Sequence, residues 1–275
     1  MTYHQPTSVK DAVAILQGGG VEVIAGGTDW YPSRGNRPVT ADILDITRVD
    51  GLRGLCQAAD GWWIGAATTW TDLLRAPLPP DFDGLKAAAR EVGSIQIQNA
   101  GTAAGNLCNA APAADGVPPL LVLDAQVELM SAGGQRRMPL TDFLTGVRRT
   151  ARAPGELMTG LWIPKTALGG QSGFTKLGAR RYLVISVAMV AVWLRLDGDV
   201  IAEARVAVGA CSPVAQRLTA MEAALTGCPV ADYAARLSPG QLAPLSPITD
   251  VRADASYRSD AVLTLCADAV AEASK

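Results

Sequence analysis

The first 50 residues alternate between a helical and an extended hydrophobic pattern. Apolar side chains recur at the i, i+3, i+4, i+7 spacing from Val9 to Leu16, which predicts an amphipathic helix. Thr7 or Ser8 can cap the start of this helix, and the three glycines at 18–20 end it. The chain therefore begins with one short helix that has a single apolar face.

Two extended runs follow that helix. Residues 21–25 (VEVIA) predict a strand that stops at the pair Gly26-Gly27. Residues 41–47 (ADILDIT) predict a second strand. We expect these two strands to follow the order β-α-β.

The middle of the chain mixes strand and helix patterns around a hairpin. The expected elements are a strand over 62–70, a helix over 83–93, a glycine-bearing loop over 99–115, a hairpin over 125–140 and a strand over 155–164. The hairpin is expected to turn at Gly133-Gly134. A glycine-bearing loop after a hydrophobic element thus occurs twice, and this is the one hint of repetition.

The last third of the chain predicts three strands and two helices. The strands are expected over 173–178, 183–196 and 200–210, and the helices over 216–227 and 259–274. A tight turn at Asp197-Gly198-Asp199 joins the last two strands, and 238–247 is expected to be a loop. The glycine-rich residues 167–173 are expected to link this part to the rest. The chain as a whole is predicted to be α+β.

Composition narrows the class of protein. The chain has 275 residues, of which 49% are hydrophobic and 18% charged, and its formal net charge is −2. A nucleic-acid-binding protein needs a clustered basic patch, which this balance does not suggest. No apolar run reaches the ~18 residues typical of a membrane helix, and the first ten residues lack the apolar core of a signal peptide. We therefore expect a cytoplasmic protein.

Cysteine and histidine usage excludes several chemistries. The five cysteines are widely spaced and form no CxxC, so neither a zinc ribbon, a disulfide framework nor an iron–sulfur cluster held by this chain alone is expected. The only histidine, His4, lies near the start, where we expect a surface residue. Ser-His-Asp and Cys-His catalysis and histidine-rich zinc sites are therefore disfavoured. We predict no metal site and no side chain acting as a nucleophile or an acid–base catalyst.

The two glycine-bearing loops carry the candidate chemistry. Glycine accepts positive φ, so successive N–H groups can turn toward one point and form a concave anion site. Residues 26–28 could build one such site, with Asp29 capping the next turn, and residues 101–106 could build another. Two such sites suit a ligand with two adjacent phosphates, such as a dinucleotide. Neither loop matches a P-loop or the Rossmann G-x-G-x-x-G pattern.

Five motifs in order resemble one family. The chain is similar to the flavoprotein, or medium, subunit of molybdenum hydroxylases, the FAD-binding chain of the xanthine dehydrogenase and carbon monoxide dehydrogenase family. The resemblance covers nearly the whole chain. The motifs are AGGTDW (25–30), QIQNAGTAAGN (96–106), NAAPAAD (109–115), ELMTGLWIP (156–164) and FTKLGARR (174–181).

The resemblance implies a fold and its domains. Residues 1–168 would form an FAD-binding domain of the PCMH/vanillyl-alcohol-oxidase type, with two α/β subdomains over about 1–55 and 56–168. Residues 169–275 would form a carbon monoxide dehydrogenase flavoprotein-type C-terminal α+β domain that covers the flavin and contacts partners.

The resemblance also implies which residues contact FAD. Both glycine-bearing loops would lie on the pyrophosphate, and further contacts would come from later motifs. The expected FAD-binding residues are Val23, Ile24, Ala25, Gly26, Gly27, Thr28, Asp29, Trp30, Gly101, Thr102, Ala103, Ala104, Gly105, Asn106, Asn109, Asp115, Met158, Lys176 and Tyr182.

Three of these side chains have two open interpretations. Lys176 either places a cation near the polar edge of the flavin or is a solvated strand lysine. Tyr182 either stacks on the flavin ring or is an ordinary packed tyrosine. Trp30 either packs on the cofactor or sits in the core, and the core is the favoured interpretation.

The sequence also departs from the family pattern. Ala103 and Ala104 stand where Ile-Gly is usual, and Ala104 would add a methyl group where backbone approaches phosphate and adopt positive φ less freely than glycine. Gln98 stands where arginine is common, which removes a cation close to the phosphates.

The resemblance finally implies a function. The chain would take electrons onto FAD from two [2Fe-2S] clusters of a small partner chain, fed by a large molybdopterin partner, and pass them to an external acceptor. A dimer of heterotrimers would fit the family. The alternatives are a stand-alone FAD-dependent oxidase or reductase, and a scaffold subunit that has lost its flavin.

Overall fold

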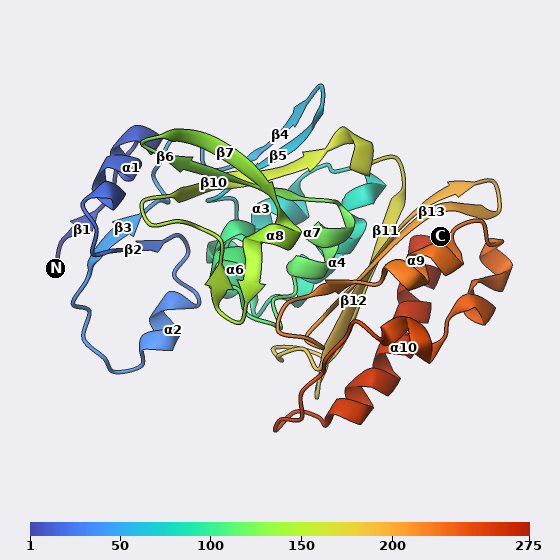
Figure 1. Cartoon of the computed structure of the whole chain (residues 1–275). Coiled ribbons are helices and arrows are strands. Elements are labelled where there is room, and N and C mark those ends of the chain that lie inside the picture. The colour runs from blue at the N-terminus through green and yellow to red at the C-terminus, as the bar shows by residue number, and fades with distance from the viewer.

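The computed structural model describes all 275 residues and contains four sheets. A small sheet near the N-terminus lies at one end of the molecule, and helices of the C-terminal third lie at the other (Figure 1). Helices and strands are mixed throughout, so the α+β prediction is confirmed. No helix combines the length and apolar character needed to cross a membrane.

The N-terminal sheet contains both predicted strands and a third, β1, that was not predicted. Its strands pair in parallel in the order β1-β3-β2. Ser8 caps α1, because its side chain accepts a hydrogen bond from the N–H of Asp11 at 3.1 Å. The elements are β1 (Tyr3–His4), α1 (Val9–Gln17), β2 (Val21–Ile24), α2 (Trp30–Arg34) and β3 (Asp42–Asp45).

A five-stranded antiparallel sheet forms the centre of the molecule, in the order β4-β5-β10-β6-β7. The predicted hairpin is confirmed, but Ser131 pairs with Gly134, so its turn lies at Ala132-Gly133, one residue earlier than expected. The strands are β4 (Leu55–Ala58), β5 (Gly61–Gly65), β6 (Gln126–Ser131), β7 (Gly134–Pro139) and β10 (Leu157–Pro164).

The predicted strand over 62–70 is too long. β5 ends at Gly65, and Trp70 starts the helix α3 (Trp70–Arg75). Thr69 and Asp72 form a capping box there, since each side chain bonds the backbone N–H of the other residue. This local hydrogen bonding outweighs the β-forming tendency of the threonines and tryptophan.

Helices and short strands fill the rest of this half. The predicted loop over 99–115 is largely helical, because α6 starts one residue after Thr102. These elements are η1 (Pro80–Phe82), α4 (Asp83–Glu91), α5 (Ile95–Ala100), α6 (Ala103–Asn109), α7 (Val117–Val122), α8 (Leu140–Phe143), β8 (Leu144–Gly146), β9 (Arg149–Thr150) and η2 (Lys165–Ala167).

The C-terminal sheet is antiparallel, in the order β11-β12-β13-β14. It lies between two layers of helix: α9 and α10 contact it on one side, and α4 and α7 on the other (Figure 1). The elements are β11 (Gln171–Leu177), β12 (Ala188–Asp197), β13 (Val200–Gly209), β14 (Gln216–Arg217), α9 (Thr219–Leu225), η3 (Val230–Arg236), η4 (Pro239–Leu242) and α10 (Ala255–Ala273).

Three boundaries in this part differ from prediction. The strand expected over 183–196 starts only at Ala188, so 183–187 lie outside the sheet. The loop expected over 238–247 begins with the short helical turn η4. The helix expected over 216–227 starts only at Thr219, because Gln216 and Arg217 pair with β13 as the unpredicted strand β14. The other two strands, the turn between β12 and β13 and the last helix are confirmed.

Strand β12 is apolar on both faces because it borders two cores. Met189, Ala191 and Trp193 belong to a core of 42 buried residues shared with the N-terminal half. Val190 and Val192 belong to a core of 17 residues beneath α9 and α10. Alternating side chains of one strand thus fill both cores, which explains the uninterrupted apolar run in the sequence.

Hydrogen bonds to Asp81 hold the glycine-rich segment before β11 in place. Asp81 Oδ1 accepts hydrogen bonds from the N–H groups of Gly169 and Gly170 at 2.7 and 2.8 Å. The same oxygen accepts the indole N–H of Trp193 at 2.9 Å. The carboxylate thus ties the two halves of the chain together.

Candidate functional site

The structure brings the two glycine-bearing segments into contact. Gly26 lies so close to the carbonyl of Ala100 that a Cβ atom there would collide with it. A Cβ atom at Gly101 would lie 3.1 Å from Oγ1 of Thr28. Segments about 75 residues apart in sequence therefore form one surface, and only glycine permits this close approach of backbones.

The first segment presents unpaired backbone donors. Gly27 has φ +67°, and the N–H groups of Gly26, Gly27 and Thr28 are not bonded to any backbone oxygen. Ala25 precedes them directly after β2, which also contains the expected site residues Val23 and Ile24. A run of free N–H groups with one positive φ is the arrangement that binds a phosphate.

Asp29 does not cap α2, and that prediction is wrong. It stands at the N-cap position, but its side chain accepts no capping hydrogen bond. Its φ of −103° and ψ of −33° are helical. A capping side chain needs the extended conformation to reach the N–H groups of the next turn.

The second segment is the start of α6. The Thr102 side chain caps the helix and accepts the Gly105 N–H at 2.9 Å. The N–H groups of Ala103 and Ala104 bond to no backbone oxygen. First-turn N–H groups have no partner within their own helix, which is why the start of a helix can bind an anion.

The substitution of Ile-Gly by Ala103-Ala104 has less effect than the sequence suggested. Both alanines have ordinary helical backbones, and their side chains are 1% and 3% exposed in the core. The expected strain at Ala104 is therefore absent, because the methyl group points into the core instead of requiring positive φ.

Asn106, in α6, has a buried side-chain oxygen. Its Oδ1 is buried and has no hydrogen-bond partner. A Cβ atom at Gly116 would lie 3.1 Å from this oxygen, so the space beside it is narrow. Buried polar atoms are normally paired, so Asn106 fits a site completed by a polar molecule.

Asn109 lies at the other end of α6. Its side-chain oxygen accepts a hydrogen bond from Arg148, and its backbone carbonyl accepts a second from the same guanidinium at 3.3 Å. Arg148, which has φ +56°, was not predicted to belong to the site.

A buried ion pair joins the two halves of the chain. Lys176 Nζ lies 2.8 Å from Asp115 Oδ2, and their side chains are 6% and 10% exposed. Ser186 donates its hydroxyl to Asp115 Oδ1 at 2.6 Å. Burial raises the pKa of Asp115, while Lys176 and Ser186 act to lower it. The interpretation of Lys176 as a solvated strand lysine is therefore wrong.

Met158 is a core residue. It is 3% exposed, in β10, and its Sδ lies 3.8 Å from Sγ of Cys108 in α6. It lies at a register shift in the pairing of β10 with β6.

The two aromatic candidates lie outside the core. Trp30 is half-buried and donates its indole N–H to Glu22 at 2.6 Å, with the guanidinium of Arg34 4.5 Å from the ring centre. Tyr182 is 64% exposed, and the guanidinium of Arg181 lies 5.6 Å from its ring centre. The core interpretation of Trp30 and the packed interpretation of Tyr182 are both wrong.

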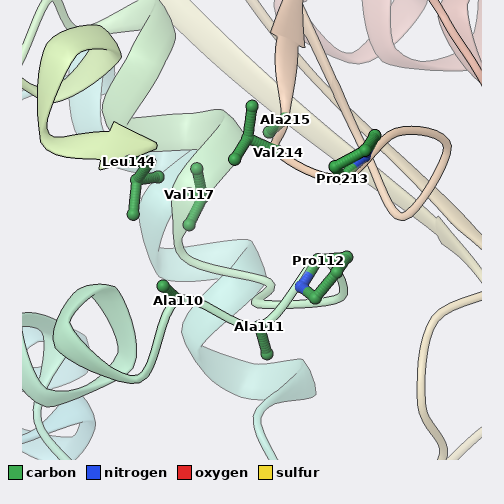
Figure 2. Close-up of a pocket in the computed structure, with 8 residues that line it drawn as sticks. All are labelled: Ala110, Ala111, Pro112, Val117, Leu144, Pro213, Val214 and Ala215. Atoms are coloured by element: carbon green, nitrogen blue, oxygen red, sulfur yellow. The ribbon is translucent and has the colours of Figure 1, made fainter. Parts of the chain in front are cut away.

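A small pocket near α6 is too small for a cofactor. It lies between the turn at Ala110–Pro112 and the loop at Pro213–Ala215 (Figure 2). Its volume of about 10 Å³ has room for a single water molecule. This pocket is therefore not the candidate site, which we take to be the surface made by the two glycine-bearing segments.

Comparison with known proteins identifies the family. Residues 1–166 match the model of the FAD binding domain in molybdopterin dehydrogenase. Residues 174–273 match the model of the CO dehydrogenase flavoprotein C-terminal domain.

Individual relatives match over almost their whole length. The xanthine dehydrogenase FAD-binding subunit of Escherichia coli O157:H7 is 30% identical over 280 residues, 99% of this chain and 95% of that protein. The carbon monoxide dehydrogenase medium chain of Afipia carboxidovorans is 31% identical over 271 residues, 94% and 91% of the two chains. A carbon monoxide dehydrogenase structure from Hydrogenophaga pseudoflava superposes with TM-score 0.89 at 28% identity, over 99% and 96% of the two chains.

The chain therefore belongs to the family of FAD-binding medium subunits of xanthine and carbon monoxide dehydrogenases. It is an oxidoreductase subunit, and its cofactor is FAD. The resemblance and the fold class predicted from the sequence are both confirmed.

Proposed function

We propose that this chain is the electron-transfer subunit of a multi-subunit molybdenum hydroxylase. Two [2Fe-2S] clusters of a small partner chain deliver electrons to FAD held here, and an external acceptor removes them. A large partner chain holds molybdopterin and oxidises the substrate. The family membership and the names of the relatives support this assignment.

The contact between the two glycine-bearing segments carries the proposal. Free N–H groups of Gly26, Gly27 and Thr28 lie on one side, and those of Ala103 and Ala104 on the other. We assign them to the two phosphates of the FAD pyrophosphate. The unpaired oxygen of Asn106 supports a polar ligand at the same place.

The remaining assignments stay proposals. We place Asp115 and Lys176 near the flavin, where a fixed ammonium stabilises negative charge at its polar edge. Bound FAD supplies the redox chemistry, and the chain binds it, orients it and holds charge beside it. Met158, Asn109, Trp30 and Tyr182 stay predicted contacts.

Three further predictions accompany this assignment. The FAD-binding domain spans 1–168 and the C-terminal domain 169–275. The complex is a dimer of heterotrimers. The cytoplasm stays the predicted compartment.

Reconstitution of the complex with and without this chain tests the function. Without it, substrate should still reduce the iron–sulfur clusters, but turnover with the natural acceptor should be lost. Adding back the FAD-loaded chain should restore turnover. Unchanged turnover in its absence would contradict the proposal.

A further inference from the structure

Ser186 is not among the predicted site residues, but it bonds to the buried ion pair of Asp115 and Lys176. Ser186 is 2% exposed, and its hydroxyl donates to Asp115 Oδ1 at 2.6 Å. The other carboxylate oxygen, Oδ2, accepts from Lys176 Nζ at 2.8 Å. Both oxygens of one buried carboxylate are thus held from different parts of the chain.

This carboxylate fastens both ends of one exposed segment. Lys176 lies near the end of β11 and Ser186 just before β12, and the Val187 N–H bonds to the Leu177 carbonyl at 2.8 Å. The intervening residues 180–185 are largely exposed and include Tyr182. Asp115 therefore joins the base of this segment to the N-terminal half of the molecule.

The hydrogen bonds of Lys176 leave one donor free. An ammonium group has three N–H donors. One bonds to Asp115 at 2.8 Å, and a second to the backbone carbonyl of Glu91 at 3.4 Å. The direction of the third donor depends on where Asp115 holds Nζ.

Ser186 limits how Asp115 can move. A carboxylate held at one oxygen can rotate about its last bond and take its partner with it. Asp115 is held at both oxygens, so rotation breaks the hydrogen bond with Ser186. This hydrogen bond also favours the charged form of Asp115, against the effect of burial and of the nearby Glu91 carboxylate.

We propose that Ser186 is a positioning residue of the cofactor site, which orients Asp115 and, through it, the Lys176 ammonium toward FAD. This inference rests on the proposed FAD site. Ser186 itself touches no reacting group in this scheme.

The test is the midpoint potential of FAD bound to the full-length chain, measured in wild type, Ser186→Ala and Lys176→Met and in the double variant. Ser212→Ala is the matched control. Ser212 is also buried, at 7% exposure, but its hydroxyl donates to the Cys211 carbonyl at 2.6 Å, and it has no hydrogen bond to Asp115 or Lys176.

Ser186→Ala should lower the equilibrium constant for FAD reduction by about fivefold, the usual net effect of one hydrogen bond. For a two-electron couple this is about 20 mV. Lys176→Met should lower the potential further, and Ser186→Ala should then have no added effect, because it acts through Lys176. Ser212→Ala should leave the potential unchanged.

The outcomes separate the two proposals. A wild-type chain without FAD would refute the proposed function. If wild type binds FAD and Lys176→Met shifts the potential, an unshifted Ser186→Ala would overturn the positioning role alone, as would a shift that persists in the double variant. Should Ser186→Ala fail to fold, Ser186→Cys replaces it, because cysteine has a similar shape and is a weaker donor. An unshifted potential in Ser186→Cys, or a shift that persists when Lys176→Met is added, would then overturn the positioning role.

Discussion

The two sides of the proposed cofactor site are built in opposite ways. On the side of Gly26-Gly27 and α6, several backbone N–H groups bond to no backbone oxygen, and one buried oxygen, that of Asn106, is unpaired. On the side of Asp115 and Lys176, both carboxylate oxygens are bonded and the side chains are buried. The first side is therefore suited to bind a ligand, and the second to hold a charge in a fixed place.

The difference predicts different responses to mutation. Changes on the backbone side should act mainly on FAD affinity, because its donors have no other partner. Changes on the side-chain side should act mainly on stability and on the flavin potential, because its groups already satisfy one another.

Removing the buried cation should have the largest effect. Lys176→Met leaves the Asp115 carboxylate buried without its partner, and breaking such pairs costs about 3–5 kcal/mol. Urea unfolding of the full chain measures this loss. Lys165→Met, at an exposed lysine, is the control and should change stability little. Equal stability of the two variants would show that the ion pair contributes nothing.

Separating the two segments should have the next largest effect. Gly26→Ala places a Cβ atom against the Ala100 carbonyl, and relief of such a collision costs about 1–3 kcal/mol. The chain should then lose FAD, because the two sets of N–H groups move apart. FAD content per chain measures this. Gly240→Ala, where nothing lies within 4 Å of the new Cβ, should keep its FAD.

Restoring a family-like glycine should have a smaller effect. Ala104→Gly places glycine inside α6 and should cost about 1 kcal/mol of stability. FAD affinity should stay within about twofold, since the Ala104 side chain faces the core and its N–H group is unchanged. Titration of the apo chain with FAD checks this. A large gain in affinity would show that the methyl group does obstruct the phosphate.

The smallest expected effect is on the stability of the fold in acid. Part of this acid sensitivity should come from Asp250, which lies outside the site. Hydrogen bonds from the Arg252 backbone and from arginine side chains lower the pKa of Asp250 to about 2. Because the folded-state pKa lies below the ordinary value, its stabilising effect is present above about pH 3.8 and is lost as the pH falls toward 2.

Asp250→Asn should therefore flatten the decrease in melting temperature between pH 4 and pH 2. The pKa of Asp115 is shifted the other way, so it adds no such acid-labile stabilisation. A wild-type acid profile in Asp250→Asn would contradict this assignment.

Much of the fold could be predicted because local rules decide it. The helix α1, with its cap at Ser8, and the hairpin of β6 and β7 follow from periodicity and turn chemistry, although the turn lies one residue earlier than expected. The strand predicted over 62–70 failed because the capping box of Thr69 and Asp72 starts a helix inside a β-like pattern.

The site could be predicted only in part. The glycine-bearing segments were recognisable, since bare backbone is itself a local signal. The environments of Trp30 and Lys176 were not, because Glu22 and Asp115 lie 8 and 61 residues away in sequence. Ser186 gave a weak signal, as a polar residue within an apolar run, but its partner is set by tertiary structure alone.

The most direct test of the account is the visible spectrum of the chain purified under native conditions with its partners, with released flavin identified by mass. The account predicts bound FAD together with iron–sulfur absorption from co-purifying chains. Bound FAD without clusters or partners would instead support a stand-alone flavoenzyme. A folded chain that contains no flavin would contradict the central claim that the two segments together bind FAD.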